Sequence, residues 1–137
     1  MSRALLIFTF LLFPRFLYAE IPLFNTHQDY VRFVDTKVMS RDFIPLIKQL
    51  GGDDEYTDAQ LKSTNAQLLN VMPFDFTGTE LIKHVRLSAS FSQEMRVFWN
   101  AQSSYVYFYA FLHHRDDGVV VLKFNLNTNP DKIFEKF

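Results

Sequence analysis

The segment Tyr105–Leu112 (YVYFYAFL) is apolar at every position, and it constrains the fold more than any other part of the chain. Its β-branched and aromatic side chains predict a strand. Because successive strand residues point to opposite faces of a sheet, both faces of this strand are expected to be covered. Tyr105, Tyr107 and Tyr109 share one face. The more aliphatic opposite face is the natural partner for helices.

Three further strands are predicted around this segment. Arg115–Gly118 (RDDG) is a hairpin signal, because Gly118 can adopt positive φ. Val119–Leu126 then supplies the partner strand. Alternating apolar and polar residues predict two earlier strands, at about residues 81–89 and 94–99.

The residues before these strands, from about Asp29 to Met72, are predicted to form helices. Tyr30, Val34 and Val38 recur at the spacing of one helical face. Gly51–Gly52 is a typical helix stop, and Thr57–Gln60 has the spacing of a capping box at a helix start. The predicted helices run from about Asp29 to Val38, from Asp42 to Leu50 and from Thr57 to Met72.

Three helices followed by an antiparallel meander predict a single α+β domain over residues 20–137. The preceding helices cover one sheet face, so a pocket is expected on the opposite face. The tail, Asp131–Phe137, is expected to form a short helix.

Ser40–Phe43 (SRDF), the Gly51–Gly52 break and the strand pair YVYFYAFL…GVVVLKFNLNT carry a family resemblance. Over roughly Phe24–Asn129 the chain resembles the cystatin-like, nuclear-transport-factor-like cone-fold superfamily, and small exported bacterial proteins of that type. The resemblance implies N-terminal helices packed on a curved four-stranded antiparallel sheet. That superfamily includes isomerases, dehydratases, polyketide cyclases and non-catalytic binders, so the fold does not choose a function. Its enzymes usually place Asp or His in the pocket, and no such motif is matched residue by residue in this chain.

The N-terminus reads as a signal peptide over residues 1–19. Arg3 gives a positive start, and Ala4–Phe13 is a ten-residue apolar run, too short to span a bilayer. Ala19 is the expected last residue of the leader, although Leu17 is bulkier than the small residue preferred two positions earlier. An uncleaved anchor is the alternative, but Arg15 interrupts it. The protein is therefore expected to be exported, periplasmic or secreted, with no membrane association after cleavage.

Charge and cysteine content exclude several classes of function. Two of the 14 basic residues, Arg3 and Arg15, lie in the leader, so the mature chain has 12 basic against 15 acidic residues and a net charge of −3. This balance argues against a nucleic-acid partner. Without any cysteine, thiol catalysis and thiolate zinc sites are excluded, and no cofactor is expected.

Two clusters of polar residues are candidates for chemistry. His113 and His114 should point to opposite faces of their strand, so a shared metal site is not expected. His84 and Arg86 share a strand face, away from Leu81 and Val85, and Glu94 and Arg96 share a face of the next strand. If the two faces coincide, these four groups form a cross-strand set of surface charges; the alternative is a pocket with His84 as general base, oriented by Glu94 or Arg96.

The tyrosine face of Tyr105–Leu112 is the candidate binding surface, because large rings with polar rims suit a ligand cleft or an interface. The alternative is that it packs under the tail or the loop near Pro73–Gly78. The predicted binding residues are Tyr105, Tyr107, Tyr109, Trp99, His84 and Arg96. These residues favour an exported binding domain for a small apolar or aromatic ligand, or for a protein. The alternatives are a cofactor-free isomerase or hydro-lyase and a subunit that forms a homodimer through its sheet. No catalytic motif and no metal-ligand set is predicted.

Overall fold

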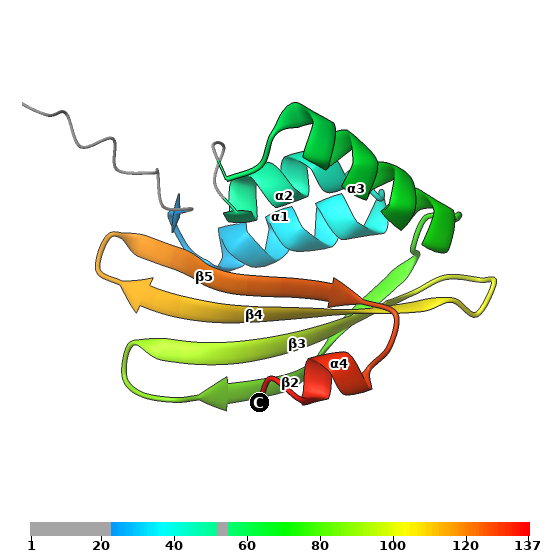
Figure 1. The fold of residues 1–137 in the computed structure, drawn as a ribbon. Coiled ribbons are helices and arrows are strands. Elements are labelled where there is room, and N and C mark those ends of the chain that lie inside the picture. The colour runs from blue at the N-terminus through cyan, green and yellow to red at the C-terminus, as the bar shows by residue number, and fades with distance from the viewer. Residues whose placement is uncertain (1–22, 52–54) are drawn as a thin grey trace, which may run out of the picture.

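Five antiparallel strands form one open sheet, and three helices cover one of its faces (Figure 1). The computed structural model describes residues 23–51 and 55–137, so the predicted leader and its cleavage point lie outside the described residues. The strand order is β1-β5-β4-β3-β2. The elements are β1 (Leu23–Phe24), α1 (His27–Met39), α2 (Phe43–Gly51), α3 (Asp58–Val71), β2 (Gly78–Arg86), β3 (Phe91–Trp99), β4 (Tyr105–Arg115), β5 (Gly118–Asn127) and α4 (Asp131–Phe134). The α+β class is confirmed, with five strands in place of four.

Local capping sets where two of the helices begin, as the sequence predicted. The Thr26 hydroxyl accepts a hydrogen bond of 3.0 Å from the backbone N–H of Asp29 at the start of α1. At the start of α3 the Thr57 hydroxyl accepts a hydrogen bond from the backbone N–H of Gln60, and the Gln60 side chain accepts one from the backbone N–H of Thr57. These two bonds confirm the capping box. Each cap pairs a backbone donor that the helix itself leaves without a partner.

The aliphatic side of β4 forms the main core with the helices. Phe108 and Leu112 are fully buried there, in one cluster with Tyr30 and Val34 of α1. The prediction that this side of β4 faces the helices is therefore confirmed. We call the helix-facing side of the sheet the inner face and the opposite side the outer face.

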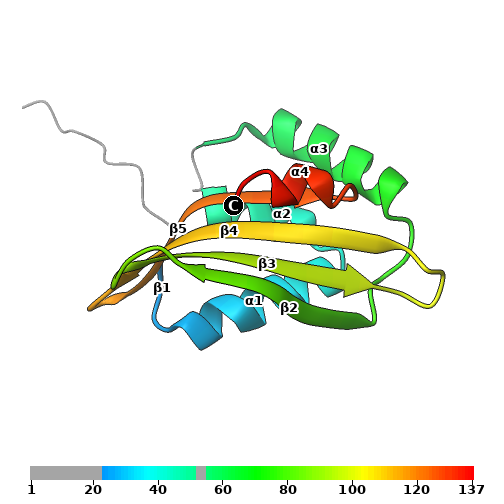
Figure 2. The same ribbon diagram turned by 90° about the horizontal axis from the view of Figure 1, so that it is seen from below.

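The C-terminal helix α4 packs on the outer face (Figures 1 and 2). Ile133 of α4 is fully buried in a second cluster with Met95 and Tyr109. The Lys83 ammonium lies 4.3 Å from the ring centroid of Phe137. The tail is thus helical as expected, and it gives the sheet a second apolar layer.

The short strand β1 is the element that the sequence pattern missed. Leu23 pairs with Val120 and Phe24 with Val119 at the edge of β5. A Cβ atom at Gly118, whose φ is 148°, would overlap the carbonyl oxygen of Phe24. Gly118 therefore serves the hairpin turn and also lets β1 approach β5.

A β-bulge shifts the register of the edge strand β2. The irregularity falls between Leu81 and Lys83, so Leu81 is opposite Arg96 on the inner face. Val85 is opposite Gln93 on the outer face. Simple alternation placed Leu81 and Val85 on one face, and that placement is wrong because the extra residue of the bulge reverses the alternation.

The other end of β2 is held under an aromatic ring. Gly78 lies directly beneath the indole of Trp99, where a Cβ atom would overlap the ring. Any side chain at position 78 would therefore collide with this indole and displace it.

Candidate functional site

The six predicted binding residues do not form one surface. Cα partners in an antiparallel pair share a sheet face, and Trp99, Tyr107 and Tyr109 belong to pairs on the outer face. The fourth aromatic residue, Tyr105, is opposite Trp99. His84 is opposite Glu94, and both Glu94 and Arg96 contact α1 on the inner face. The predicted set therefore divides into an aromatic group and a polar group on opposite faces.

Part of the aromatic group is closed off by the tail. Tyr109 is only 4% exposed, and its ring meets the ring of Phe137 edge to face with centroids 5.4 Å apart. Its hydroxyl accepts a hydrogen bond of 2.9 Å from Gln93. At the far end of the row Tyr105 is 51% exposed. Packing under the tail, one of the two alternatives for this face, therefore describes Tyr109.

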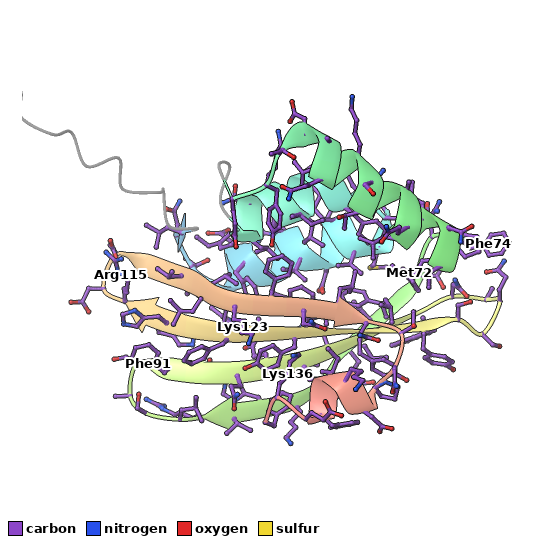
Figure 3. The ribbon with its side chains drawn as sticks, viewed as in Figure 1. Met72, Phe74, Phe91, Arg115, Lys123 and Lys136 are labelled. Atoms are coloured by element: carbon purple, nitrogen blue, oxygen red, sulfur yellow. The ribbon has the colours of Figure 1, made fainter. Side chains whose placement is uncertain are left out.

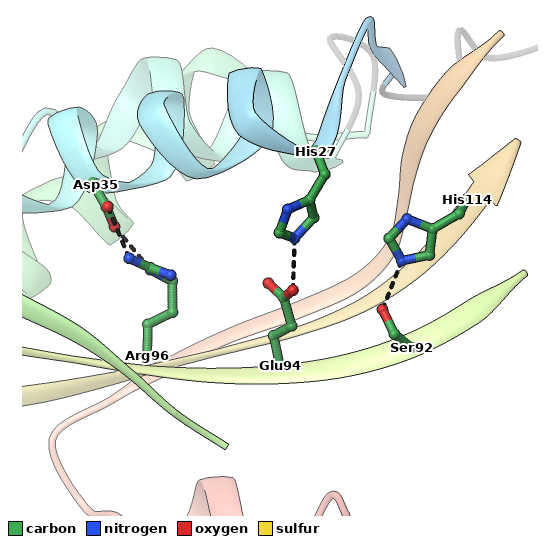
Figure 4. Close-up of polar contacts among 6 residues, drawn as sticks. All are labelled: His27, Asp35, Ser92, Glu94, Arg96 and His114. Carbon is green, nitrogen blue, oxygen red and sulfur yellow. Dashed lines mark hydrogen bonds and ion pairs between the residues drawn. The ribbon is translucent and has the colours of Figure 1, made fainter. Parts of the chain in front are cut away.

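The inner face holds a buried carboxylate paired with a histidine from α1 (Figure 4). Glu94 is 1% exposed, and its Oε1 lies 2.6 Å from Nε2 of His27. This hydrogen bond, helped by the negative charge of Glu94, raises the pKa of His27 above 6.5, although burial works in the opposite direction. The first turn of α1 therefore places an imidazole with a raised pKa over β3.

A second ion pair joins the same helix to the same strand. The guanidinium of Arg96 donates two hydrogen bonds of 2.8 Å to the carboxylate of Asp35 (Figure 4). Arg96 is 7% exposed, so this is a bidentate pair with little access to solvent. The hypothesis that Glu94 or Arg96 orients His84 is therefore not supported, because within the described ranges both side chains pair with α1.

Beside these pairs, a serine of β3 meets a histidine of β4. Ser92 Oγ and His114 Nε2 are 2.7 Å apart, and the His114 ring centroid lies 5.8 Å from that of His27 (Figure 4). Burial lowers the pKa of His114 below 6.5, and the positive charge of His27 lowers it further. A neutral imidazole with Nε2 unprotonated accepts the hydrogen bond that the Ser92 hydroxyl donates.

These groups border a hollow of about 250 Å³ that we call the histidine pocket, lined by His84, Arg86, Ser88, Ala89, Phe91, Ser92 and His114. The Arg86 guanidinium donates to the backbone oxygens of Ser88 at 3.2 Å and Ala89 at 3.5 Å, so the β2–β3 turn holds it in place. The pocket lies at the end of the sheet that carries Phe91 and Arg115, opposite the end near Phe74 (Figure 3).

Two buried polar atoms beside the pocket have no protein partner among the described residues. They are Oε2 of Glu94 and the hydroxyl of Tyr30. Burial raises the pKa of Tyr30 well above 10, and the nearby negative charge of Glu94 adds to that shift. The space between α1 and β3 thus keeps hydrogen-bonding capacity that the fold does not use.

A second hollow of about 240 Å³ lies between α2, α3 and β5. Its walls are mostly apolar, with Phe43, Leu61 and Phe124 among them. No group of three His, Asp or Glu side chains within residues 23–51 and 55–137 is arranged to hold a metal ion. His113 stacks on Phe91 with centroids 4.3 Å apart, on the face away from His114, as the alternation predicted.

Sequence reasoning missed several residues of this region. His27, Asp35 and Tyr30 all come from α1, and 67 positions separate His27 from Glu94. Ser92 could have been predicted, since it continues the alternation of Glu94 and Arg96 along one strand face.

Comparisons of the chain with protein-family models, with curated proteins and with solved structures found no match. Among the described helices, none is both long and apolar enough to cross a bilayer.

Proposed function

We propose that this protein is an exported binding domain for a small carboxylate-bearing molecule, held in the histidine pocket. One observation carries the proposal. The pocket wall combines Arg86 with His84, Ser92 and His114 and includes no acidic side chain. Such a wall presents hydrogen-bond donors and positive charge to whatever enters.

The chemistry of Arg86 favours a carboxylate. A guanidinium offers a planar edge of N–H donors that matches the two oxygens of a carboxylate. The turn carbonyls of Ser88 and Ala89 occupy part of the group and fix its direction, which leaves other donors for a ligand.

The histidine pocket is preferred as the binding site over the aromatic group formed by Trp99, Tyr105, Tyr107 and Tyr109. Tyr109, in the row, is covered by α4 and packs in an apolar cluster, so a ligand would first have to displace Ile133. The histidine pocket needs no such displacement.

The proposal also includes export of the protein and its membership of a superfamily. Export is supported by the ten-residue apolar run that follows Arg3. Membership of the cystatin-like, nuclear-transport-factor-like superfamily is supported by the order of elements, with three helices followed by the meander β2-β3-β4-β5.

The test is a titration of the folded protein with succinate, followed through the ring resonances of its four histidines. His84 and His114 signals should shift together, while His113, on the outer face, should not move. Arg86→Gln should weaken binding by about tenfold or more, the loss expected for a charge-assisted hydrogen bond. Arg32→Gln is the matched control, because that side chain is 68% exposed on α1. Succinate that leaves all four rings unmoved would refute the proposal.

The second candidate function is a cofactor-free enzyme, and one observation favours it. The 2.7 Å contact between Ser92 and His114 joins a hydroxyl to an imidazole whose pKa is lowered, on the wall of the same pocket. A neutral imidazole next to a hydroxyl is the arrangement that activates a serine.

A further inference from the structure

We propose that Ser92 is a nucleophile activated by His114, and that the histidine pocket hydrolyses small esters that carry a free carboxylate. The inference rests on the proposed function, since Arg86 would hold the carboxylate while the ester carbonyl lies against Ser92. It assigns an acyl-transfer chemistry in place of the isomerase or hydro-lyase chemistry expected for a His84-centred site.

The geometry provides the first argument. Ser92 Oγ lies 2.7 Å from His114 Nε2, within the distance needed for proton transfer in the reaction. Both residues line the pocket, and Ser92 is buried in its wall at 2% exposure. Within the described part of the chain, this is the one side-chain hydrogen bond that Ser92 makes, so no second partner competes for its hydroxyl.

The surroundings of His114 provide the second argument. A general base must be neutral before it accepts a proton, and burial together with the charge of His27 keeps the His114 pKa low. The negative charge of Glu94 acts the other way and favours the imidazolium that forms during the reaction. His27 and Glu94 therefore act through His114, because their charges shift its pKa. Neither is among the residues that line the pocket.

The proposed reaction balances without a cofactor. Ser92 Oγ attacks the ester carbonyl carbon, and the hydroxyl proton passes to His114 Nε2. The carbon–oxygen bond to the leaving alcohol then breaks, and that alkoxide takes the proton from His114. Water next attacks the acyl-serine with His114 again as base, which releases the acid and restores Ser92. His84 is the N–H donor on the pocket wall that is available to the carbonyl oxygen.

The first experiment treats the folded wild-type protein with a fluorophosphonate and locates any adduct by peptide mass spectrometry. The adduct should lie on Ser92, and Ser92→Ala should not react. His114→Gln should slow labelling by about 100-fold, the typical contribution of a general base. His113→Gln, the same change one residue away on the outer face, should leave the rate unchanged. No adduct on the wild-type protein, or an adduct elsewhere that persists in Ser92→Ala, would overturn the inference.

The pH profile of the wild-type labelling rate tests the role of His114 without any variant. The rate should rise with pH through a single ionisation below 6.5, because the base must lose its proton first. A serine that merely donates a structural hydrogen bond would give no such step. A flat profile would overturn the assignment of His114, even where His114→Gln fails to fold.

A second experiment separates this inference from the proposed function. Turnover of mono-4-nitrophenyl succinate is compared with that of 4-nitrophenyl acetate, which carries no free carboxylate. Arg86→Gln should slow the succinate ester about tenfold more than it slows the acetate ester. If both esters acylate Ser92 equally well in wild type and variant, the nucleophile stands and the carboxylate proposal fails. If succinate shifts the histidine signals but Ser92 never reacts, the binding proposal stands and this inference fails.

Discussion

Glu94 at the middle of β3 accepts a hydrogen bond of 2.6 Å from His27 in the first turn of α1, although 67 positions separate them. Glu94 is buried, whereas the His27 side chain is 42% exposed. The pair therefore fixes the start of α1 over the sheet, and it links the protonation of one histidine to the stability of the fold.

The stability conferred by His27 should fall as the pH rises. Its folded-state pKa lies above the ordinary value of 6.5, so the extra stability is fully present below pH 6.5 and is lost as the pH passes through the raised pKa. The free energy of unfolding of wild type minus that of His27→Gln, measured in urea, should decrease over this window. His114 is present in both proteins, but the charge of His27 lowers its pKa, so the difference also contains this coupling between the two histidines. In a Glu94→Gln background the difference should lose its slope; if the slope persists there, Glu94 is not the cause.

Loss of Asp35 should destabilise the fold strongly. Asp35→Asn leaves the buried guanidinium of Arg96 without its anion, at an expected cost of about 3 kcal/mol. Asp117→Asn is the matched control, because Asp117 accepts the same two 2.8 Å hydrogen bonds from Arg115 at the surface. That change should cost less than about 1 kcal/mol. Equal costs in urea unfolding would show that burial does not set the value of the Asp35 pair.

The outer cluster should contribute to stability through α4. Ile133→Ala removes a fully buried side chain packed on Met95 and Tyr109, and it should cost about 2–5 kcal/mol. Its neighbour Phe134 is 48% exposed, and Phe134→Ala should cost less than about 1 kcal/mol. The melting temperatures of the two variants give the comparison. If Ile133→Ala melts with the wild type, α4 does not hold the outer face.

If the proposed export is correct, the mature protein should begin near Glu20. Cleavage after Ala19 would remove the apolar run and leave 118 residues, from Glu20 to Phe137. Intact mass spectrometry of the periplasmic or secreted fraction gives the N-terminus directly. Intact Met1 in the membrane fraction would instead mark residues 4–19 as an uncleaved anchor.

Much of the fold follows from patterns between near neighbours. The capping box at Thr57 and the opposite orientations of His113 and His114 depend only on local geometry, and both were predicted. The two-residue strand β1 is too short to show a period, so it was missed. The bulge in β2 was also missed, since an inserted residue leaves no mark in a simple alternation.

The candidate site was predicted only where it follows the strands. Alternation placed His84 with Arg86 and, separately, Glu94 with Arg96, and the register brings the two pairs to one face, with His84 opposite Glu94. The partners of Glu94 and Arg96 come from α1, and they depend on the angle at which α1 crosses the sheet. That angle is set by packing of the whole core, so no local pattern contains it.

The single tryptophan of the chain lies over Gly78, and this gives the molecule an optical probe of its own sheet edge. Indole emission depends on what covers the ring, so intrinsic fluorescence follows the attachment of β2 to β3. Far-ultraviolet circular dichroism follows chiefly α1, α2 and α3 on the other side of the core. Two signals that change together would mark the edge strand and the helices as one cooperative unit. An earlier fluorescence change would mark β2 as a separate unit that detaches first, and the histidine pocket, which takes His84 and Arg86 from β2, would come apart with it.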